Sequence, residues 1–339
     1  MYLYKMIFIL TLMMGTLISV SSSTWLGTWM GLEINLLSFI PLMKEKNNPY
    51  SSESSMKYFL IQAMASAVFL FSIILMSAMN HFNSEIYMIN EFNLTIINSS
   101  LLMKMGAAPF HFWFPEIIEG MNWINSLILM TWQKIAPMMI LSYSLKSSNF
   151  IMIIIIMCSI IGSLGGLNQT SLRKIMAFSS INHIGWMISS FMSNEMMWSI
   201  YFSIYTLIST TIILMLNSFN IFYLSQMFIL MNKNILIKFS MLLNFLSLGG
   251  LPPFLGFLPK WMIIQQLSNN YSLMILIMIL ATLITLFFYM RIAYTSIMIN
   301  HNQMNFEMKN YNLMPIMIIF LTFISLTGLT ICTLMFNLY

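Results

Sequence analysis

Charged residues are scarce in this sequence, and aspartate is missing from it. Only 7% of the 339 residues are charged, and all nine acidic residues are glutamate. A soluble domain carries roughly 25% charged residues, so a water-soluble fold is excluded. The net charge of +5 is spread thinly, with no basic stripe of the kind that binds nucleic acid. Two cysteines in a chain of this length exclude a disulfide-stapled secreted scaffold.

Sequence motifs for redox or nucleotide chemistry are also missing. Cys158 and Cys332 stand alone in apolar stretches, without the spacing of an iron–sulfur or C-x-x-C site. No G-x-G-x-x-G loop occurs. The glycines of 162–166 favour close packing between helices instead. We therefore expect no cofactor and no metal in this chain.

Hydrophobic residues are what the sequence has in abundance, at 59% of the chain. Its 27 Phe, 8 Trp and 14 Tyr exclude disorder. The 38 Met, with heavy use of Ile, Asn and Phe, fit an AT-rich gene read with an extra Met codon, as in animal mitochondria. An AT-rich bacterial gene is the alternative. The N-terminus shows no pattern of a cleavable signal or transit peptide.

Apolar runs of about 20 residues, the length that crosses a bilayer as a helix, recur along the whole chain. Eleven of them are predicted, and no stretch between them is long enough for a water-soluble domain. The longer connections, 44–55, 80–95, 220–236 and 297–313, are polar. The fold class is therefore an all-α polytopic membrane protein. The predicted spans are 3–22, 24–43, 56–79, 96–119, 122–145, 150–167, 174–192, 196–219, 237–266, 272–296 and 314–337.

Lysine and arginine divide unequally between the two sides of this topology. The side that holds the N-terminus carries ten of them, and the opposite side carries only Lys146. Basic residues gather on the cytoplasmic or matrix side, so we expect the N-terminus there and the C-terminus opposite. The ten are Lys5, Lys44, Lys46, Lys57, Arg173, Lys174, Lys233, Lys238, Arg291 and Lys309.

Three lysines and one glutamate lie well inside predicted spans rather than near their ends: Lys104, Lys134, Lys260 and Glu33. Each costs roughly 2.5–3.5 kcal/mol at the centre of a span, and such residues commonly mark ion or proton paths. His183 is a fifth polar group of this kind. The alternative for each is a packing or snorkelling role.

Prolines and glycines follow Lys104 and precede Lys260, and they predict interrupted helices at Gly106–Pro109 and Leu248–Pro253. For Pro137 a simple kink is equally plausible. The two interrupted spans are five spans apart. Because five is odd, the second set of helices would run opposite to the first, as in an inverted-topology repeat. Spans within 1–145 would form the first repeat and those within 150–296 the second, with 314–337 added. Carbonyls freed at the breaks need new donors, which lysine or water can supply.

The stretches around these residues resemble the antiporter-like, proton-pumping subunits in the membrane arm of respiratory complex I, in an insect-like form. The matching stretches are WLGTWMGLEINLLSFIP, LLMKMGAAPFHFWFPE, TWQKIAP, GGLNQTSLRKIMAFSSINHIGWM and NFLSLGGLPPFLGFLPKW.

The resemblance implies a place in the mitochondrial inner membrane, with the other membrane-arm subunits and membrane lipids as partners. It implies that Glu33 and Lys104 form a pair in a first half-channel. Lys134 would be the connecting lysine on the central axis. Lys260 would serve a second half-channel, and His183 would lie between these lysines. NADH, FMN, iron–sulfur and ubiquinone chemistry would belong to other subunits of the NADH:ubiquinone reductase.

Two other functions fit the same buried lysines. One is a free-standing cation/proton antiporter built on the same repeat. The other is a structural membrane subunit whose buried charges do no transport.

Overall fold

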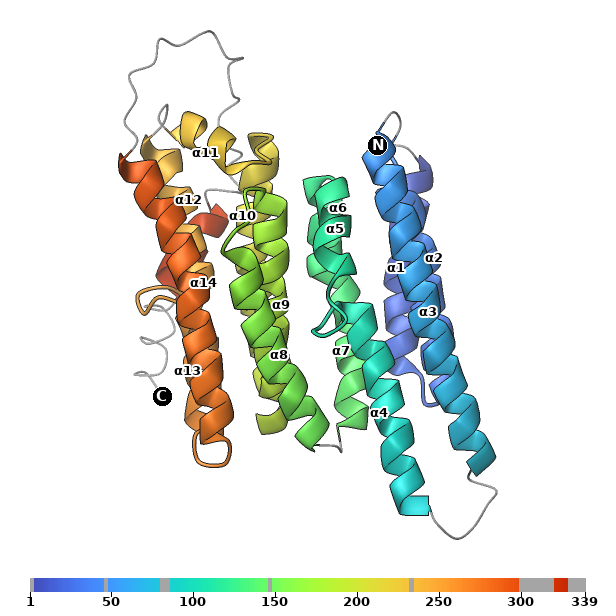
Figure 1. Ribbon diagram of the computed structural model, residues 1–339. Coiled ribbons are helices and arrows are strands. Elements are labelled where there is room, and N and C mark those ends of the chain that lie inside the picture. The colour runs from blue at the N-terminus through green and yellow to red at the C-terminus, as the bar shows by residue number, and fades with distance from the viewer. Residues whose placement is uncertain are drawn as a thin grey trace. The chain divides into compact units, whose positions relative to one another are not determined.

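The computed structural model describes residues 3–45, 48–79, 86–145, 148–231, 235–298 and 320–328. Across these residues the chain forms fourteen named helices, and the β-contact recorded there is an isolated bridge between Ser171 and Tyr223. The all-helical class predicted from the sequence is confirmed. The chain divides into two compact units, Met1–Cys158 and Ser159–Tyr339, and each is described by itself below (Figure 1).

Seven helices lie wholly in the first unit, where α1, α2 and α3 run alongside one another (Figure 1). The α1–α2 pair is close because Gly31 faces α1: a Cβ added there would lie 2.5 Å from the backbone nitrogen of Ser19. In α3 the first residue is Pro49, whose missing N–H costs nothing at that position. The helices are α1 (Leu3–Ser21), α2 (Trp25–Met43), α3 (Pro49–Met79), α4 (Ile86–Met105), α5 (Trp113–Gly120), α6 (Trp123–Met130) and α7 (Trp132–Ser144).

The second unit is organised around α9, which is buried on nearly every side. Helix α10 packs against α9, α12 and α13. Helix α8 crosses the boundary between the units, and its glycines pack closely as predicted, because a Cβ on Gly162 would lie 2.6 Å from the backbone nitrogen of Asn182. The helices are α8 (Ser148–Gly166), α9 (Leu172–Ser193), α10 (Glu195–Ser218), α11 (Leu224–Met231), α12 (Ile235–Gly249), α13 (Phe257–Leu267) and α14 (Ser272–Met298).

Among the described residues, seven segments are long and apolar enough to cross a membrane: Tyr4–Ser21, Trp25–Met43, Pro49–Ala78, Trp123–Ser144, Asn149–Gly166, Glu195–Ser218 and Ser272–Tyr294. The chain is thus a multi-pass membrane protein. Predicted spans 96–119 and 237–266 are each divided into two helices, and 174–192 is the buried α9. Most of 314–337, with Cys332, lies outside the described residues. The count of eleven stays a prediction.

Two connections predicted to be polar loops are partly helical. Helix α4 begins at Ile86, inside 80–95, and α11 occupies part of 220–236. The start of α11 is stabilised locally, because the Oε1 atom of Gln226 accepts hydrogen bonds from the backbone N–H groups of Phe222 and Tyr223.

A further break, between α6 and α7, was not predicted. At Thr131 the backbone N–H and the side-chain hydroxyl both donate to the carbonyl of Leu127, at 3.0 and 2.7 Å. A hydroxyl that competes in this way for a helix carbonyl bends the helix. Pro137 lies inside α7, which continues through it. The interruption therefore lies six residues before the proline that predicted a kink.

Candidate functional site

The end of α4 is a glycine-terminated helix end. Gly106 has a φ of +72°, in the left-handed region. Its N–H donates to the carbonyl of Met103, and the N–H of Ala107 donates to that of Leu102. This pair of bonds is the Schellman motif, in which glycine closes a helix because it alone adopts this φ without strain. Pro109 follows and prevents the helix from continuing.

The end of α12 repeats the same construction. Gly250 has a φ of +87°. Its N–H donates to the carbonyl of Ser247, and the N–H of Leu251 donates to that of Leu246. Pro252 and Pro253 follow after one residue. Both breaks therefore fall where the glycine and proline pattern predicted them, and glycine rather than proline ends each helix.

Carbonyls left open at the two breaks have side-chain donors. At α4, the open carbonyl of Lys104 accepts a hydrogen bond from Nε2 of Gln62 at 3.2 Å. The carbonyl of Met103, which already accepts the N–H of Gly106, accepts a second bond from Nε1 of Trp113 at 3.2 Å. At α12, the Nζ atom of Lys260 donates to the carbonyl of Gly249 at 2.8 Å. At one break a buried lysine thus donates a hydrogen bond to a freed carbonyl, as the sequence predicted. At the other break neutral side chains are the donors.

Lys104 lies in the last turn of α4, and its side chain is 8% exposed. Among the residues that the structure describes, its ammonium group has no hydrogen-bond partner, and it lies 5.8 Å from the centre of the Phe69 ring, within the range of a cation–π contact. Glu33, half-buried on α2, is close enough to interact with it electrostatically. No ion pair of 4 Å or less joins the two among the described residues. The predicted pair is therefore near but not in direct contact.

Lys134 lies on α7 and is 1% exposed. Its Nζ atom lies 5.5 Å from the centre of the Phe114 ring. Phe114 also packs on the first break, because a Cβ on Gly106 would lie 3.0 Å from its Cβ. The thiol of Cys158 accepts a hydrogen bond from the N–H of Ala108 at 3.2 Å and interacts electrostatically with Lys134. Lys134 and the broken end of α4 therefore share one environment.

A polar contact ties the helix of Glu33 to the helix of Lys134. Nε2 of Gln133 on α7 donates to Oδ1 of Asn35 on α2 at 2.9 Å. This bond holds the two helices at a fixed separation in the first unit.

In the second unit, His183 is buried on α9, and its Nδ1 atom lies 2.8 Å from the hydroxyl of Tyr201. Its ring lies 5.1 Å from that of Tyr205. A cavity of about 10 Å³ separates these side chains from Gly256 and Pro259, which belong to the second break and the start of α13. That volume is at the lower limit for one water molecule. His183 thus lies beside the helix break that carries Lys260.

The five predicted residues fall into two groups: Glu33, Lys104 and Lys134 in the first unit, and His183 and Lys260 in the second. Gln62 and Tyr201 were missed. Gln62 is a polar residue inside an apolar span, which is the signal that identified the lysines. The role of Cys158 could not be found, because a lone cysteine in an apolar stretch has no such signal. Within the described residues no cluster of three or more His, Cys, Asp or Glu is placed to hold a metal.

The sequence matches the family model described as NADH:quinone oxidoreductase/Mrp antiporter, transmembrane, over residues 22–287. A chain of respiratory complex I from Thermus thermophilus, solved with bound aureothin, superposes with a TM-score of 0.85 at 21% identity, covering 97% of this chain and 78% of that one. This likeness shows a shared fold. The chain belongs to the NADH:quinone oxidoreductase/Mrp antiporter family.

Within the family, the chain is similar to proteins named NADH-ubiquinone oxidoreductase chain 2. The protein of that name from Anopheles gambiae is 54% identical over 334 residues, which cover 97% of each chain. The one from Aedes aegypti is 56% identical, also over 97% of each chain. The insect-like resemblance drawn from the sequence motifs is confirmed.

Proposed function

We propose that this chain is an antiporter-like, proton-translocating subunit in the membrane arm of mitochondrial respiratory complex I. The observation that carries the proposal is the pair of glycine-terminated helix breaks, each with a buried lysine at it. Family membership and the insect relatives support it. The chain would couple electron transfer from NADH to ubiquinone, performed by other subunits, to proton movement across the inner membrane.

The roles of the buried residues follow from their surroundings. Lys104, with Glu33 within electrostatic range, would receive a proton in the first half-channel. Lys134, beside the same break, would pass it along the central axis. In the second unit, His183 would act next, through the small cavity beside it, and Lys260 would release the proton. A change of charge at Glu33 would begin the transfer by altering how firmly Lys104 holds its proton.

The finer architecture is also part of the proposal. Eleven spans would include an inverted repeat, with 1–145 as the first half, 150–296 as the second, and 314–337 as an added helix. The identical glycine motifs at the two breaks support it. The basic residues would place the N-terminus in the matrix and the C-terminus in the intermembrane space.

Electron transfer would lie outside this chain. Other subunits would bind NADH, FMN, the iron–sulfur clusters and ubiquinone, and this chain would hold no cofactor of its own. Its partners would be the neighbouring membrane-arm subunits and the lipids around them.

The test is proton pumping by assembled complex I in proteoliposomes with NADH and a ubiquinone analogue. Lys260→Met removes the ammonium that bonds the carbonyl of Gly249, and we expect fewer protons per electron. Lys238→Met is the matched control, since this buried lysine is at the start of α12, away from the break. A normal ratio in Lys260→Met would support the structural-subunit reading instead.

A second measurement separates the proposal from a free-standing antiporter, which the family description also includes. The isolated chain would be placed in proteoliposomes carrying a Na⁺ gradient and no electron donor. We expect no Na⁺-driven proton flux. A Na⁺-driven proton flux that is present with the wild-type chain and disappears in Lys104→Met would favour the antiporter.

A further inference from the structure

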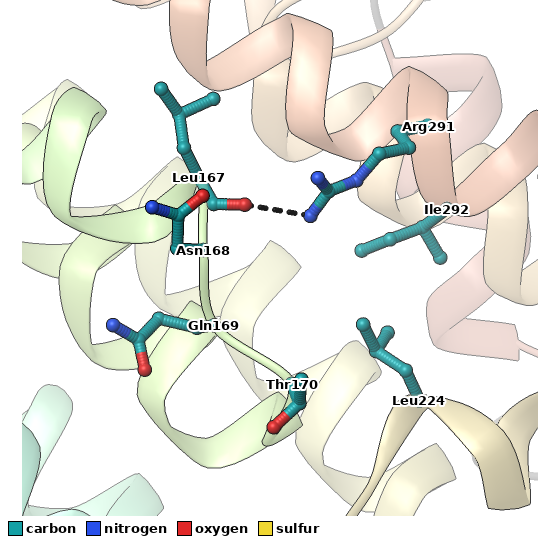
Figure 2. A pocket seen from close by; sticks show the side chains of 7 residues that line it. All are labelled: Leu167, Asn168, Gln169, Thr170, Leu224, Arg291 and Ile292. Carbon is teal, nitrogen blue, oxygen red and sulfur yellow. Dashed lines mark hydrogen bonds between the residues drawn. The ribbon is translucent and has the colours of Figure 1, made fainter.

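An open cavity of about 340 Å³ lies at one end of the second unit, and Lys260 is not among the residues that line it. Three segments line it: the turn 167–170 between α8 and α9, Leu224 at the start of α11, and Arg291 with Ile292 on α14. In Figure 2 the side chains of Arg291, Ile292 and Leu224 face this turn. The volume lies within the range of small-ligand sites in proteins, roughly 300–1,000 Å³.

Arg291 gives this cavity a fixed positive charge. Its Nη2 atom donates to the carbonyl of Leu167 at 2.7 Å, just beyond the end of α8 (Figure 2). This bond holds the guanidinium at the cavity wall, so little conformational freedom remains to be lost on binding. The side chain of Gln169 bonds the carbonyl of Gly165 instead and points away from Arg291. A guanidinium held in this way matches the oxygens of a phosphate group.

Negative charge is distant within the described part of this unit. Glu195 is its one acidic residue there, and it follows the far end of α9. At 1.5 Å per residue, the 22 residues of α9 place it roughly 33 Å away along the helix axis. Arg173 and Lys174, in the first turn of α9, add positive charge beside the turn that lines the cavity. The local field therefore favours an anion.

The residues around the cavity favour a position at the level of the lipid headgroups. Arg291 is three residues from the end of the apolar segment Ser272–Tyr294. Tyr223 and Tyr294, 46% and 56% exposed, lie next to Leu224 and three residues beyond Arg291. Exposed tyrosines mark the boundary between membrane and water. Beside the charge, Leu224 and Ile292 offer an apolar wall that suits the glycerol and upper acyl carbons of a lipid.

We propose that this cavity binds the phosphate headgroup of an anionic membrane phospholipid. Arg291 would bond the phosphate oxygens while it keeps its bond to Leu167. The apolar wall would exclude small soluble phosphates, which gain nothing from it. Such a lipid would tie α8, α11 and α14 together at one membrane surface.

The test is photolabelling of assembled complex I with phosphatidylglycerol that carries a diazirine in its acyl chain. We expect labelled peptides from the cavity segments of this chain, and at least threefold weaker labelling by the matching phosphatidylcholine probe. Arg291→Gln should reduce labelling roughly tenfold, as expected for loss of a charge-assisted hydrogen bond. Lys5→Gln, which removes a charge from α1 in the other unit, should leave it unchanged.

A second variant keeps the test independent of the Arg291–Leu167 bond. Leu224→Trp fills the cavity and leaves that bond in place, so it should also abolish labelling. Competition by millimolar glycerol phosphate would show a site for soluble phosphate and overturn the lipid assignment. Equal labelling by both lipids, or wild-type labelling in Leu224→Trp, would equally overturn it.

Discussion

Lys104→Met is the sharpest perturbation of the first unit, because it removes one charge and little else. The ammonium of Lys104 has no hydrogen-bond partner in the described part of the chain, so its loss leaves no acceptor there unpaired. The bonds that close α4 are made by the backbone, and Gln62 bonds the backbone carbonyl of residue 104 rather than its side chain. The variant should therefore assemble normally, which a blue native gel would show.

The coupling between Lys104 and Glu33 can be bounded from the structure. No ion pair of 4 Å or less joins them among the described residues. Two unit charges 4 Å apart interact by about 4 kcal/mol at an effective dielectric of about 20, and by about 1 kcal/mol in water. Because the two charges lie farther apart than 4 Å, the first of these values is an upper limit on the coupling. That limit corresponds to roughly a thousandfold in an equilibrium constant.

The assay is the number of protons pumped per electron by assembled complex I in Lys104→Met, Glu33→Gln and the double variant. We expect each single change to lower the ratio and to slow coupled electron transfer. The double variant should lose little more than the worse single one, since groups that act as a unit are non-additive. Lys57→Met is the control, because that lysine is 44% exposed and its ion pairs lie at the surface. A normal ratio in Lys104→Met, or independent losses that multiply in the double variant, would refute the pairing.

Three further outcomes are expected. Gly250→Ala should lower the stability by about 1–2 kcal/mol, because it places a side chain at positive φ. It should also lower pumping, because the new Cβ would lie 3.0 Å from the Nζ atom of Lys260. Gly249→Ala is the control, since its Cβ would lie 3.4 Å from its nearest contact. Gln62→Leu should cost about 1–3 kcal/mol by leaving the carbonyl at the end of α4 unpaired, measured as a lower thermal midpoint of the complex. Tyr201→Phe removes the hydroxyl that bonds His183 and should slow pumping while assembly is kept, whereas unchanged pumping would separate this histidine from the path.

Much of the fold was predictable from the sequence, because the bilayer imposes simple rules. Apolar length predicted the helices, and a glycine followed by proline predicted both breaks. The division at Thr131 was not predictable, because it depends on a hydroxyl that bonds Leu127. Helix α11 was missed because it is only eight residues long and its start depends on the side chain of Gln226.

The candidate site was predictable only where a residue was out of place in its span. Lys104, Lys134 and Lys260 could be found in this way, because a charge in an apolar helix has few ordinary explanations. The side chains that surround these lysines could not be predicted. Nothing in the local sequence indicates that Phe114 faces Lys134, since the two come together only through packing of α5 against the break.

Each of the two breaks has a buried lysine, although the lysines occupy different places in the sequence. Lys104 precedes its glycine by two residues, whereas Lys260 follows Gly250 by ten. In the structure both lysines nevertheless lie at the carbonyl end of an interrupted helix: Lys104 is in the last turn of α4, and Lys260 reaches back and bonds the carbonyl of the last residue of α12. That end carries a partial negative charge, which stabilises a cation. The two positions show that a lysine can lie at such a helix end from either side of the break in the sequence.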